Sequence, residues 1–423
     1  MAKLSSMKKV NHSEQKFLSI LLFSLFFAFI LNYSYVNFIF HAFESSGLIL
    51  DADNILPVII QCAGILAMLL LIKKTKKNSV HFLTSLLIFI YIPISTIYSV
   101  GGGELEFFLY SIFSFLIIFF ALGPNFVFSS NNIRIQYGQE LLIGFILIYM
   151  TYFVIFKLSG VVDLISKEMF FIEKRRYLYT DFYNLFDVYL LNWMYSAILP
   201  LLLWLSLHKK KFLYSLVLIL LILSSFFVTY KKEYIFILSC VIFLYYAQSH
   251  KWLYYFLGFL VLILMLFFGD ELFIKYFVNR QFISIGKNQY LYYDFINENS
   301  FIWFSNTFLS SFLDYPYTDT LPKIIGSQRY VSEFNNRSNS GFLGAAYSQG
   351  GVIMIMIYSA LIGLIYKKYL MLDIRYNANS HILFGIILTF KLSNNDLLTS
   401  LLSGGIAVLF IVLIILGKRF YRI

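Results

Sequence analysis

The sequence predicts an all-α, polytopic membrane protein with about twelve transmembrane helices. Hydrophobic residues make up 60% of the chain and charged residues only 13%, whereas a soluble domain carries about 25% charged residues. Long apolar runs recur along the whole length. Because a bilayer offers no water to backbone amides, such runs must be helical. The alternating apolar and polar residues of a membrane β-barrel are absent.

The apolar runs divide the chain, which we read as a single integral membrane domain over 1–423, into successive spans. A basic segment precedes the first run, and no small-residue cleavage site follows it. This run is therefore expected to be a retained helix and not a cleaved signal peptide. The predicted spans are roughly 17–40, 55–72, 80–99, 107–123, 141–159, 188–207, 212–229, 234–247, 252–269, 342–366, 381–394 and 401–417.

Lysine and arginine in short loops indicate the orientation, because cytoplasmic loops are enriched in both. With the N-terminus inside, the inner segments hold more than half of these residues, while outer loops 41–54 and 100–106 hold none. Both termini are therefore predicted to be cytoplasmic. The formal net charge of +11 is then a signal of topology and not of nucleic-acid binding.

Two long outer segments, 160–187 and 270–341, contain most of the remaining lysine and arginine residues. Long loops in a compact bundle are usually functional or disordered, and the many aromatic residues of 270–341 argue against disorder. We expect short helices in the outer interface there. Their aromatic residues would serve either as a membrane belt or as platforms for sugar rings.

The stretch Thr229–Phe236, "TYKKEYIF", is also charged although apolar runs lie on both sides. Counting helices places Lys231 and Lys232 on the outer face, where lysine is disfavoured. The stretch is a tight turn whose lysines snorkel to the interface, a sign that the helices are miscounted, or a place where charge is retained because something anionic binds there.

One region carries a family resemblance. Arg280 follows an apolar run, Tyr292–Phe295 reads "YYDF", and Asn339–Gly344 reads "NSGFLG" at the start of the next apolar run. Over about 280–365 this pattern resembles the late region of Wzy-type oligosaccharide repeat-unit polymerases, the O-antigen polymerases. Elsewhere the resemblance lies in topology alone: many helices, cytoplasmic ends and long outer loops.

The resemblance implies a glycosyltransferase of lipopolysaccharide or related surface polysaccharide biosynthesis. Such enzymes join undecaprenyl-diphosphate-linked repeat units on the outer face of the bacterial inner (plasma) membrane. The implied partners are these lipid-linked glycans, membrane lipid and a chain-length regulator protein, with no nucleic acid. No cofactor is expected. Cys62 and Cys240 lie in apolar runs, and no His/Asp/Glu cluster with ligand spacing occurs on the outer face, so we expect a metal-independent site.

Such a reaction needs cations for the diphosphate and a base for the acceptor hydroxyl. Arg280 is the first choice for the diphosphate, because a guanidinium binds phosphate oxygens in pairs. Further cationic candidates are Arg176, Lys231, Lys232 and Arg329. The base is expected among Asp294, Glu333, Glu298 and Asp319, the first two being preferred. Tyr292 and Asn339 are candidate substrate-binding residues, although Asn339, Gly341 and Gly344 also fit a helix cap and close helix packing.

Three alternatives remain open from the sequence. An O-antigen ligase has the same topology and donor, but its large outer loop typically holds a histidine, and 270–341 has none. A lipid-linked oligosaccharide flippase would carry charge inside its spans, where this chain has little. A membrane scaffold without activity is the third.

Overall fold

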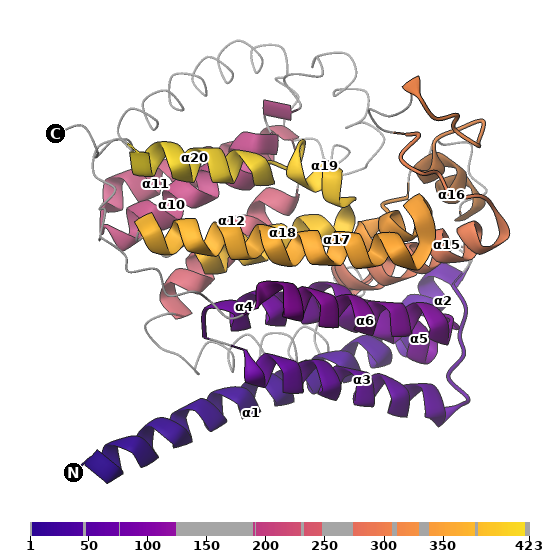
Figure 1. The fold of residues 1–423 in the computed structure, drawn as a ribbon, viewed down its shortest axis with the longest axis horizontal. Helices are drawn as coiled ribbons and strands as arrows, with labels where there is room; N and C mark the ends of the chain where they lie inside the picture. The colour runs from indigo at the N-terminus through magenta and orange to yellow at the C-terminus, as the bar shows by residue number, and fades with distance from the viewer. Residues whose placement is uncertain are drawn as a thin grey trace. The chain divides into compact units, whose positions relative to one another are not determined.

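The computed structural model describes residues 2–44, 48–75, 77–123, 189–190, 192–229, 232–247, 274–306, 311–329, 338–376 and 380–418. Within these ranges the chain is helical and contains no strand (Figure 1). The predicted all-α class is therefore confirmed for the described part of the chain. The long segment 160–187 and the predicted spans 141–159 and 252–269 lie outside it.

Six helices in the described ranges are long and apolar enough to cross a membrane, as expected of a multi-pass membrane protein. They are Phe17–Phe43, Ile55–Lys74, Asn78–Val100, Leu105–Leu122, Gly341–Ile374 and Leu397–Ile414. Each coincides with a span predicted from the sequence. Shorter apolar helices, Met194–His208, Phe212–Leu223 and His381–Asn394, occupy three further predicted positions. The total of twelve spans stays a prediction.

The chain forms two compact units, which we describe separately. Unit 1 consists of Met1–Asn125, Lys251–Lys367 and Thr389–Leu397, and unit 2 of Phe126–His250, Lys368–Leu388 and Leu398–Ile423.

Helices α1 (Ala2–Ser34), α3 (Ile55–Lys74), α5 (Ile92–Val100) and α6 (Leu105–Leu122) form the first part of unit 1 (Figure 1). A buried polar network joins three of them. The Asn32 amide donates to Gln61 Oε1 at 2.7 Å, and Gln61 Nε2 donates to Ser95 Oγ at 3.0 Å. Interhelical hydrogen bonds of this kind hold helices together in a bilayer, where the hydrophobic effect between helices is missing.

A polar helix packs along α5 in the same unit. The π-helical segment η6 (Ile274–Ile283) runs directly into α15 (Ser284–Glu298), because Ile283 keeps helical dihedrals. The Phe282 ring lies 5.1 Å from that of Phe27 and 5.9 Å from that of Phe89, two residues near the middle of apolar helices. A Cβ on Gly286 would lie 2.4 Å from the Pro93 carbonyl oxygen, so only glycine allows this approach.

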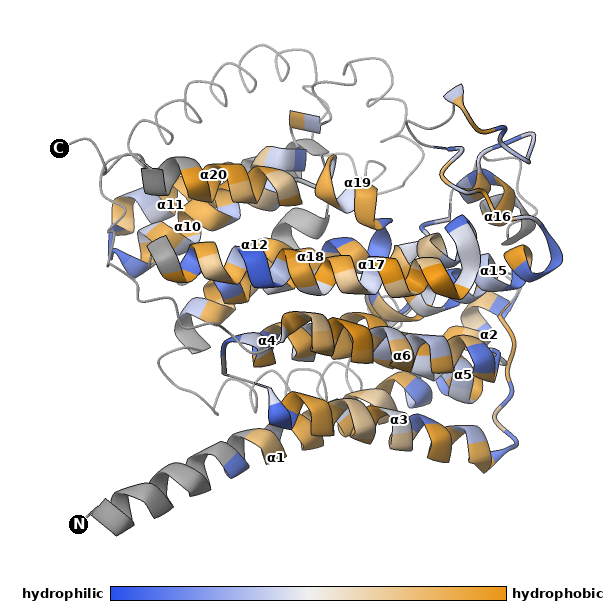
Figure 2. Ribbon diagram, viewed as in Figure 1, coloured by the Kyte–Doolittle hydropathy of each residue, from blue (hydrophilic) through white to orange (hydrophobic). Residues whose placement is uncertain are grey.

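The expectation that 270–341 is an outer loop of interfacial helices stays a prediction. Within it, α15 packs along α5, and Tyr290 reaches Gly103 in the connection between α5 and α6. Hydropathy missed the segment because its buried residues include Asn279, Lys287, Asn288 and Gln289. Figure 2 shows hydrophobic residues predominating along α3 and α6 and a mixed composition in α15.

Helix α17 (Gly341–Tyr376) is broken at Gly350 and Gly351, whose dihedrals are not helical. The segment 301–306 replaces the missing contacts there. Ile302 N–H donates to the Ser348 carbonyl at 2.9 Å, and Phe304 N–H donates to Gln349 Oε1 at 2.6 Å. The break is therefore tolerated because the freed backbone group finds a partner inside the protein.

In unit 2, π-helical turn η5 (Met194–Ile198) leads into α10 (Leu199–His208), followed by α11 (Phe212–Thr229) and α12 (Lys232–Ala247). Trp193 Nε1–H donates to the Leu402 carbonyl at 2.7 Å and so ties this part to the turn before α20 (Ile406–Lys418). Helix α11 ends at Thr229 and α12 begins at Lys232, and the role of the charged stretch between them stays a prediction. Lys231 itself lies outside the described residues.

The predicted orientation is testable with single cysteines at three exposed positions, in a protein carrying Cys62→Ala and Cys240→Ala. We expect Asp53→Cys and Ser327→Cys to react with a membrane-impermeant maleimide added to intact cells. Lys74→Cys should react only after the membrane is permeabilised, because lysine-rich loops stay inside. External labelling of Lys74→Cys, or protection of Ser327→Cys, would contradict the orientation.

A second prediction concerns the break in α17. Gly351 has φ +65° and ψ −146°, a conformation that residues with a side chain avoid. Gly351→Ala should therefore lower the free energy of unfolding by about 1–3 kcal/mol, measured by thermal unfolding in detergent. Ile353→Ala, at an exposed position of the same helix, is the control and should change stability much less. Equal effects of the two would show that the break is not strained.

Candidate functional site

Tyrosines from three elements gather around a carboxylate where α15 approaches its end. Tyr293 Oη donates to Glu106 Oε2 at 3.0 Å, and Tyr110 donates to Glu106 Oε1. Tyr347 Oη donates to Asn297 Oδ1 at 2.6 Å, and its ring lies 4.9 Å from that of Tyr293. We call Glu106, Tyr110, Tyr293, Asn297 and Tyr347 the tyrosine–carboxylate cluster.

Helical spacing explains this geometry. Glu106 and Tyr110 are one turn apart on α6, Tyr293 and Asn297 are one turn apart on α15, and such pairs share a helix face. Phe107 lies beneath, with its ring 5.0 Å from that of Tyr293. Burial is the main cause that raises the pKa of Tyr293 to about 12. The phenol therefore stays protonated and acts as a hydrogen-bond donor.

Asp294 stands beside the cluster at an exposed position of α15. Its pKa is raised from the ordinary value to about 6, first by partial removal from water, and further by the carboxylates of Glu104 and Glu298. Lys287 opposes this rise. The group is therefore mostly ionised at neutral pH, yet it is a stronger base than an ordinary aspartate.

Tyr290, one turn before Asp294, is buried with 1% of its surface exposed. Its hydroxyl has no hydrogen-bond partner among the described residues. A Cβ on Gly103 would lie 2.7 Å from the ring carbon that carries this hydroxyl, so the hydroxyl end of the ring lies against Gly103. Burial raises the pKa of Tyr290 most, and Asp294 and Glu104 contribute further.

An exposed tryptophan extends the cluster. The Phe301 ring lies 6.1 Å from that of Tyr347 and 5.7 Å from that of Trp303. Trp303 and Phe304 both have positive φ, 43° and 63°, which is rare for bulky residues. The Trp303 side chain is nevertheless 53% exposed.

Arg280 lies apart from this site. It is an exposed residue of η6, two positions before Phe282. Asp294 follows it by about four helical turns, or roughly 20 Å along the axis. An arginine side chain does not span that distance, so a substrate would have to extend between the two residues, and their joint action stays a prediction.

Tyr292 and the glycines after it join α15 to the start of α17. The buried Tyr292 hydroxyl donates to the Ser338 carbonyl at 3.0 Å, and burial raises its pKa. Gln289 Oε1 accepts from Leu343 N–H at 3.3 Å, so a residue of another helix caps α17. Cβ atoms on Gly341 and Gly344 would lie 2.7 Å and 3.1 Å from Gln289 Cδ and Tyr292 Cβ, as close packing predicts.

The other predicted site residues are less informative. Asn339 is exposed just before α17. Asp319 forms an exposed ion pair with Lys323 at 2.9 Å. Arg329 ends α16 (Leu321–Arg329) and Lys232 begins α12, but both side chains lie outside the described part of the chain, as do Arg176, Lys231 and Glu333 altogether.

Sequence reasoning missed Glu106, Tyr110 and Tyr347. The spacing of Glu106 and Tyr110 was a usable signal, because an acidic residue and a tyrosine one turn apart at a helix start often interact. No local signal marks Tyr347, whose partners come from distant parts of the chain.

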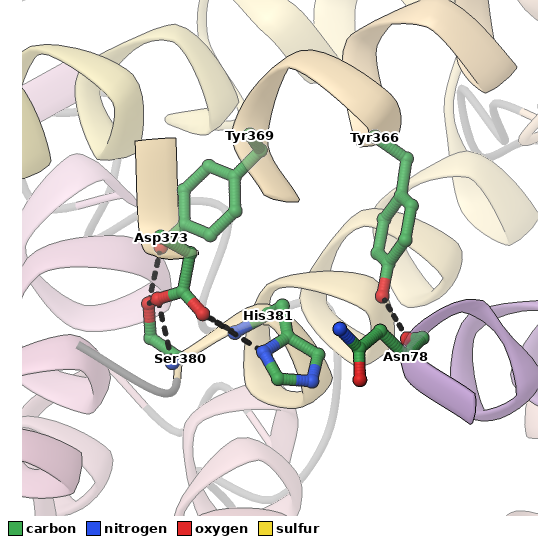
Figure 3. Close-up of polar contacts among 6 residues, drawn as sticks. All are labelled: Asn78, Tyr366, Tyr369, Asp373, Ser380 and His381. Atoms are coloured by element: carbon green, nitrogen blue, oxygen red, sulfur yellow. Dashed lines mark hydrogen bonds and ion pairs between the residues drawn. The ribbon is translucent and has the colours of Figure 1, made fainter. Parts of the chain in front are cut away.

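A second polar cluster, in unit 2, has the composition of a catalytic triad but not its connections (Figure 3). Ser380 Oγ and His381 Nδ1 bond to Asp373 at 2.6 Å and 2.8 Å, and both backbone N–H groups donate to the same carboxylate. In a triad the serine would bond to the histidine. Asp373 instead caps the start of α18 (His381–Asn394).

Among the described residues, no group of three or more His, Cys, Asp or Glu side chains is arranged to hold a metal ion. The metal-independent site stays a prediction.

Comparison of the chain with protein-family models, curated proteins and solved structures finds no match.

The raised pKa of Asp294 predicts a carboxyl group that titrates near pH 6. Infrared spectra of the wild type minus Asp294→Asn, recorded against pH, should contain its C=O band with that midpoint. Glu104→Gln should lower the midpoint, because it removes a negative neighbour. Glu14→Gln, near the start of α1, should leave it unchanged. A midpoint near pH 4, or no response to Glu104→Gln, would contradict this environment for Asp294.

The same shift gives a stability prediction of known sign. Because the folded-state pKa is raised, the folded protein binds the proton more tightly, and this contribution is complete below about pH 4. It is lost as the pH rises through about 6. Asp294→Asn should therefore gain thermal stability relative to the wild type as the pH increases from 4 to 7. A constant difference between the two proteins would contradict the prediction.

Proposed function

We propose that this chain is a polymerase that joins undecaprenyl-diphosphate-linked oligosaccharide repeat units, as the sequence resemblance implies. The observation that carries the proposal is the position of Asp294. It is an exposed carboxylate with a raised pKa, beside the tyrosine–carboxylate cluster and an exposed tryptophan. The elements that bring it there, α15 and the start of α17, are the segments in which the resemblance to such polymerases lies.

Asp294 acts as the general base in this proposal. It takes the proton of an acceptor sugar hydroxyl while that oxygen bonds to the anomeric carbon of the donor glycan. The bond between this carbon and the diphosphate oxygen breaks, and undecaprenyl diphosphate leaves. A base whose pKa lies near the working pH combines correct protonation with a useful driving force, and contributes about 10²- to 10⁴-fold in rate.

The negative charge that develops on the diphosphate needs fixed cations. In a direct displacement the base and the leaving group lie on opposite sides of the anomeric carbon, so the cations belong on the side away from Asp294. Binding of the diphosphate stays a prediction from the sequence for four cationic residues, Arg176, Lys231, Lys232 and Arg329. Arg280 is not assigned to the reaction centre, because of its separation from Asp294.

One observation favours transport as a second candidate function. Lys287, Asn288 and Gln289 are buried on a helix that lies between apolar helices, and polar residues in such places often line the path of a transported substrate. A flippase for lipid-linked oligosaccharides would use them to pass a glycan through the bundle.

Purified protein, given only undecaprenyl-diphosphate-linked repeat units, should produce a ladder of longer lipid-linked glycans without nucleotide sugar or ATP. Asp294→Asn should lower the rate by about 10²- to 10⁴-fold. Arg280→Ala should keep the rate within about tenfold of the wild type, because its side chain does not reach the base. Gel analysis of the products over time measures both rates.

Asp314→Asn is the matched control, because it neutralises another exposed aspartate of the same segment, and it should leave the rate unchanged. A large loss in Arg280→Ala with an active Asp294→Asn would move the reaction centre to the level of η6. Movement of substrate across vesicle membranes without any ladder would favour the flippase instead.

A further inference from the structure

Trp303 is held in a position that burial does not explain. The backbone adopts positive φ at Trp303 and Phe304, yet about half of the indole remains exposed. A Cβ on Gly350 would lie 2.8 Å from the Trp303 ring, so part of the indole rests on the backbone of the broken helix. Strained backbone that keeps a large side chain in a fixed, accessible place is a feature of binding sites.

The support of this residue is rigid. Gln349 is buried, accepts from Phe304 N–H and donates from Nε2 to Asn306 Oδ1 at 3.3 Å. The break in α17 and the segment 301–306 therefore fix each other. A fixed aromatic side chain with an accessible surface can stack on the C–H face of a sugar ring, with little loss of side-chain entropy on binding.

The charge of the neighbouring surface restricts what binds. Glu104, Glu106, Asp294 and Glu298 all belong to the exposed surface of unit 1, and Glu104 and Glu298 act electrostatically on Asp294. The cation that opposes them, Lys287, is buried. A carboxylate or phosphate placed on this surface would be repelled, whereas an ammonium group would be attracted and hydroxyl groups would find acceptors.

Tyr290 adds an independent indication that something binds beside Glu104. Its hydroxyl is buried, lies at the end of the ring that packs against Gly103, and has no partner in the described part of the chain. An unpaired buried donor costs free energy. A bound ligand that brings a hydrogen-bond acceptor within reach of this hydroxyl would remove that cost.

We propose that Trp303, Asn297 and the carboxylates of Glu104, Glu106, Asp294 and Glu298 form a glycan-binding surface. The terminal sugar of the acceptor stacks on the indole, and the carboxylates select neutral or amino sugars over acidic ones. This inference rests on the proposed polymerase function, because an acceptor glycan belongs to that reaction. It adds the chemical class of the glycan that the protein accepts.

Three free trisaccharides test the selectivity: chitotriose, which is neutral, its fully deacetylated form, which carries ammonium groups, and trigalacturonate, which is anionic. Calorimetric titration of the full-length protein in detergent at low salt should rank the amino form tightest and trigalacturonate weakest, at least tenfold apart. The gap should shrink in 0.5 M salt, because screening weakens exposed charges. Equal affinities, or tightest binding of trigalacturonate, would overturn the inference.

Two sets of variants separate stacking from charge. Trp303→Ala should weaken binding of all three sugars at least tenfold, and Trp303→Phe less so. The pair Glu104→Gln and Glu298→Gln should reduce the gap between the affinities for the amino and anionic forms, and should change chitotriose binding much less than Trp303→Ala does. Phe312→Ala, which removes another exposed aromatic residue of the same segment, is the control. If it weakens binding as much as Trp303→Ala, adsorption to exposed apolar surface explains the signal and the inference falls.

Thermal unfolding shows whether each variant is folded. If Trp303→Ala does not fold, Trp303→Phe and the paired glutamine variant still decide the question. If the protein makes a glycan ladder but binds the three sugars without charge selectivity, this inference is wrong and the proposed polymerase function stands. If it binds the sugars with charge selectivity but makes no ladder, the glycan-binding surface stands and the proposed polymerase function is wrong.

Discussion

The contact between Gly286 and the backbone of Pro93 sets the position of α15, and therefore of the side chains that α15 contributes to the candidate site. Because a Cβ there would lie 2.4 Å from the carbonyl oxygen, α15 approaches α5 as closely as two helices allow. This contact fixes the register. One turn later Tyr290 meets Gly103, and one turn after that Tyr293 reaches Glu106 and Asp294 emerges beside it. The start of α17 then packs on the same helix through Gln289, Gly341 and Gly344.

Hydropathy predicts the apolar helices of this protein well, because their burial in lipid is a property of each segment alone. It does not find η6 and α15, whose polar side chains are satisfied by residues far away in the chain. Gln289 illustrates the reason. Taken alone it argues against a buried position, and only the start of α17, which it caps, makes its burial favourable.

The candidate site was likewise predicted in part. Asp294 was identified because it lies in a segment with a family resemblance, and the structure provides the physical reason for its raised pKa. Glu106 was read as the last residue of the short outer loop 100–106, and its pairing with Tyr293, a residue far away in the chain, could not be predicted. The sequence also did not reveal how far Arg280 lies from Asp294, because the continuous helix that separates them by about four turns was read as part of an outer loop.

The polar character of α15 also has a consequence for biogenesis. Each lysine or arginine near the centre of a helix adds roughly 2.5–3.5 kcal/mol to the cost of its insertion from the translocon, and η6 and α15 include Lys275, Arg280 and Lys287. Such a segment does not partition into lipid by itself. In the folded protein it contacts α1 and α5, which are synthesised earlier. The N-terminal helices of unit 1 thus provide the packing surface for the later chain, and variants that disturb their packing would first impair the docking of α15.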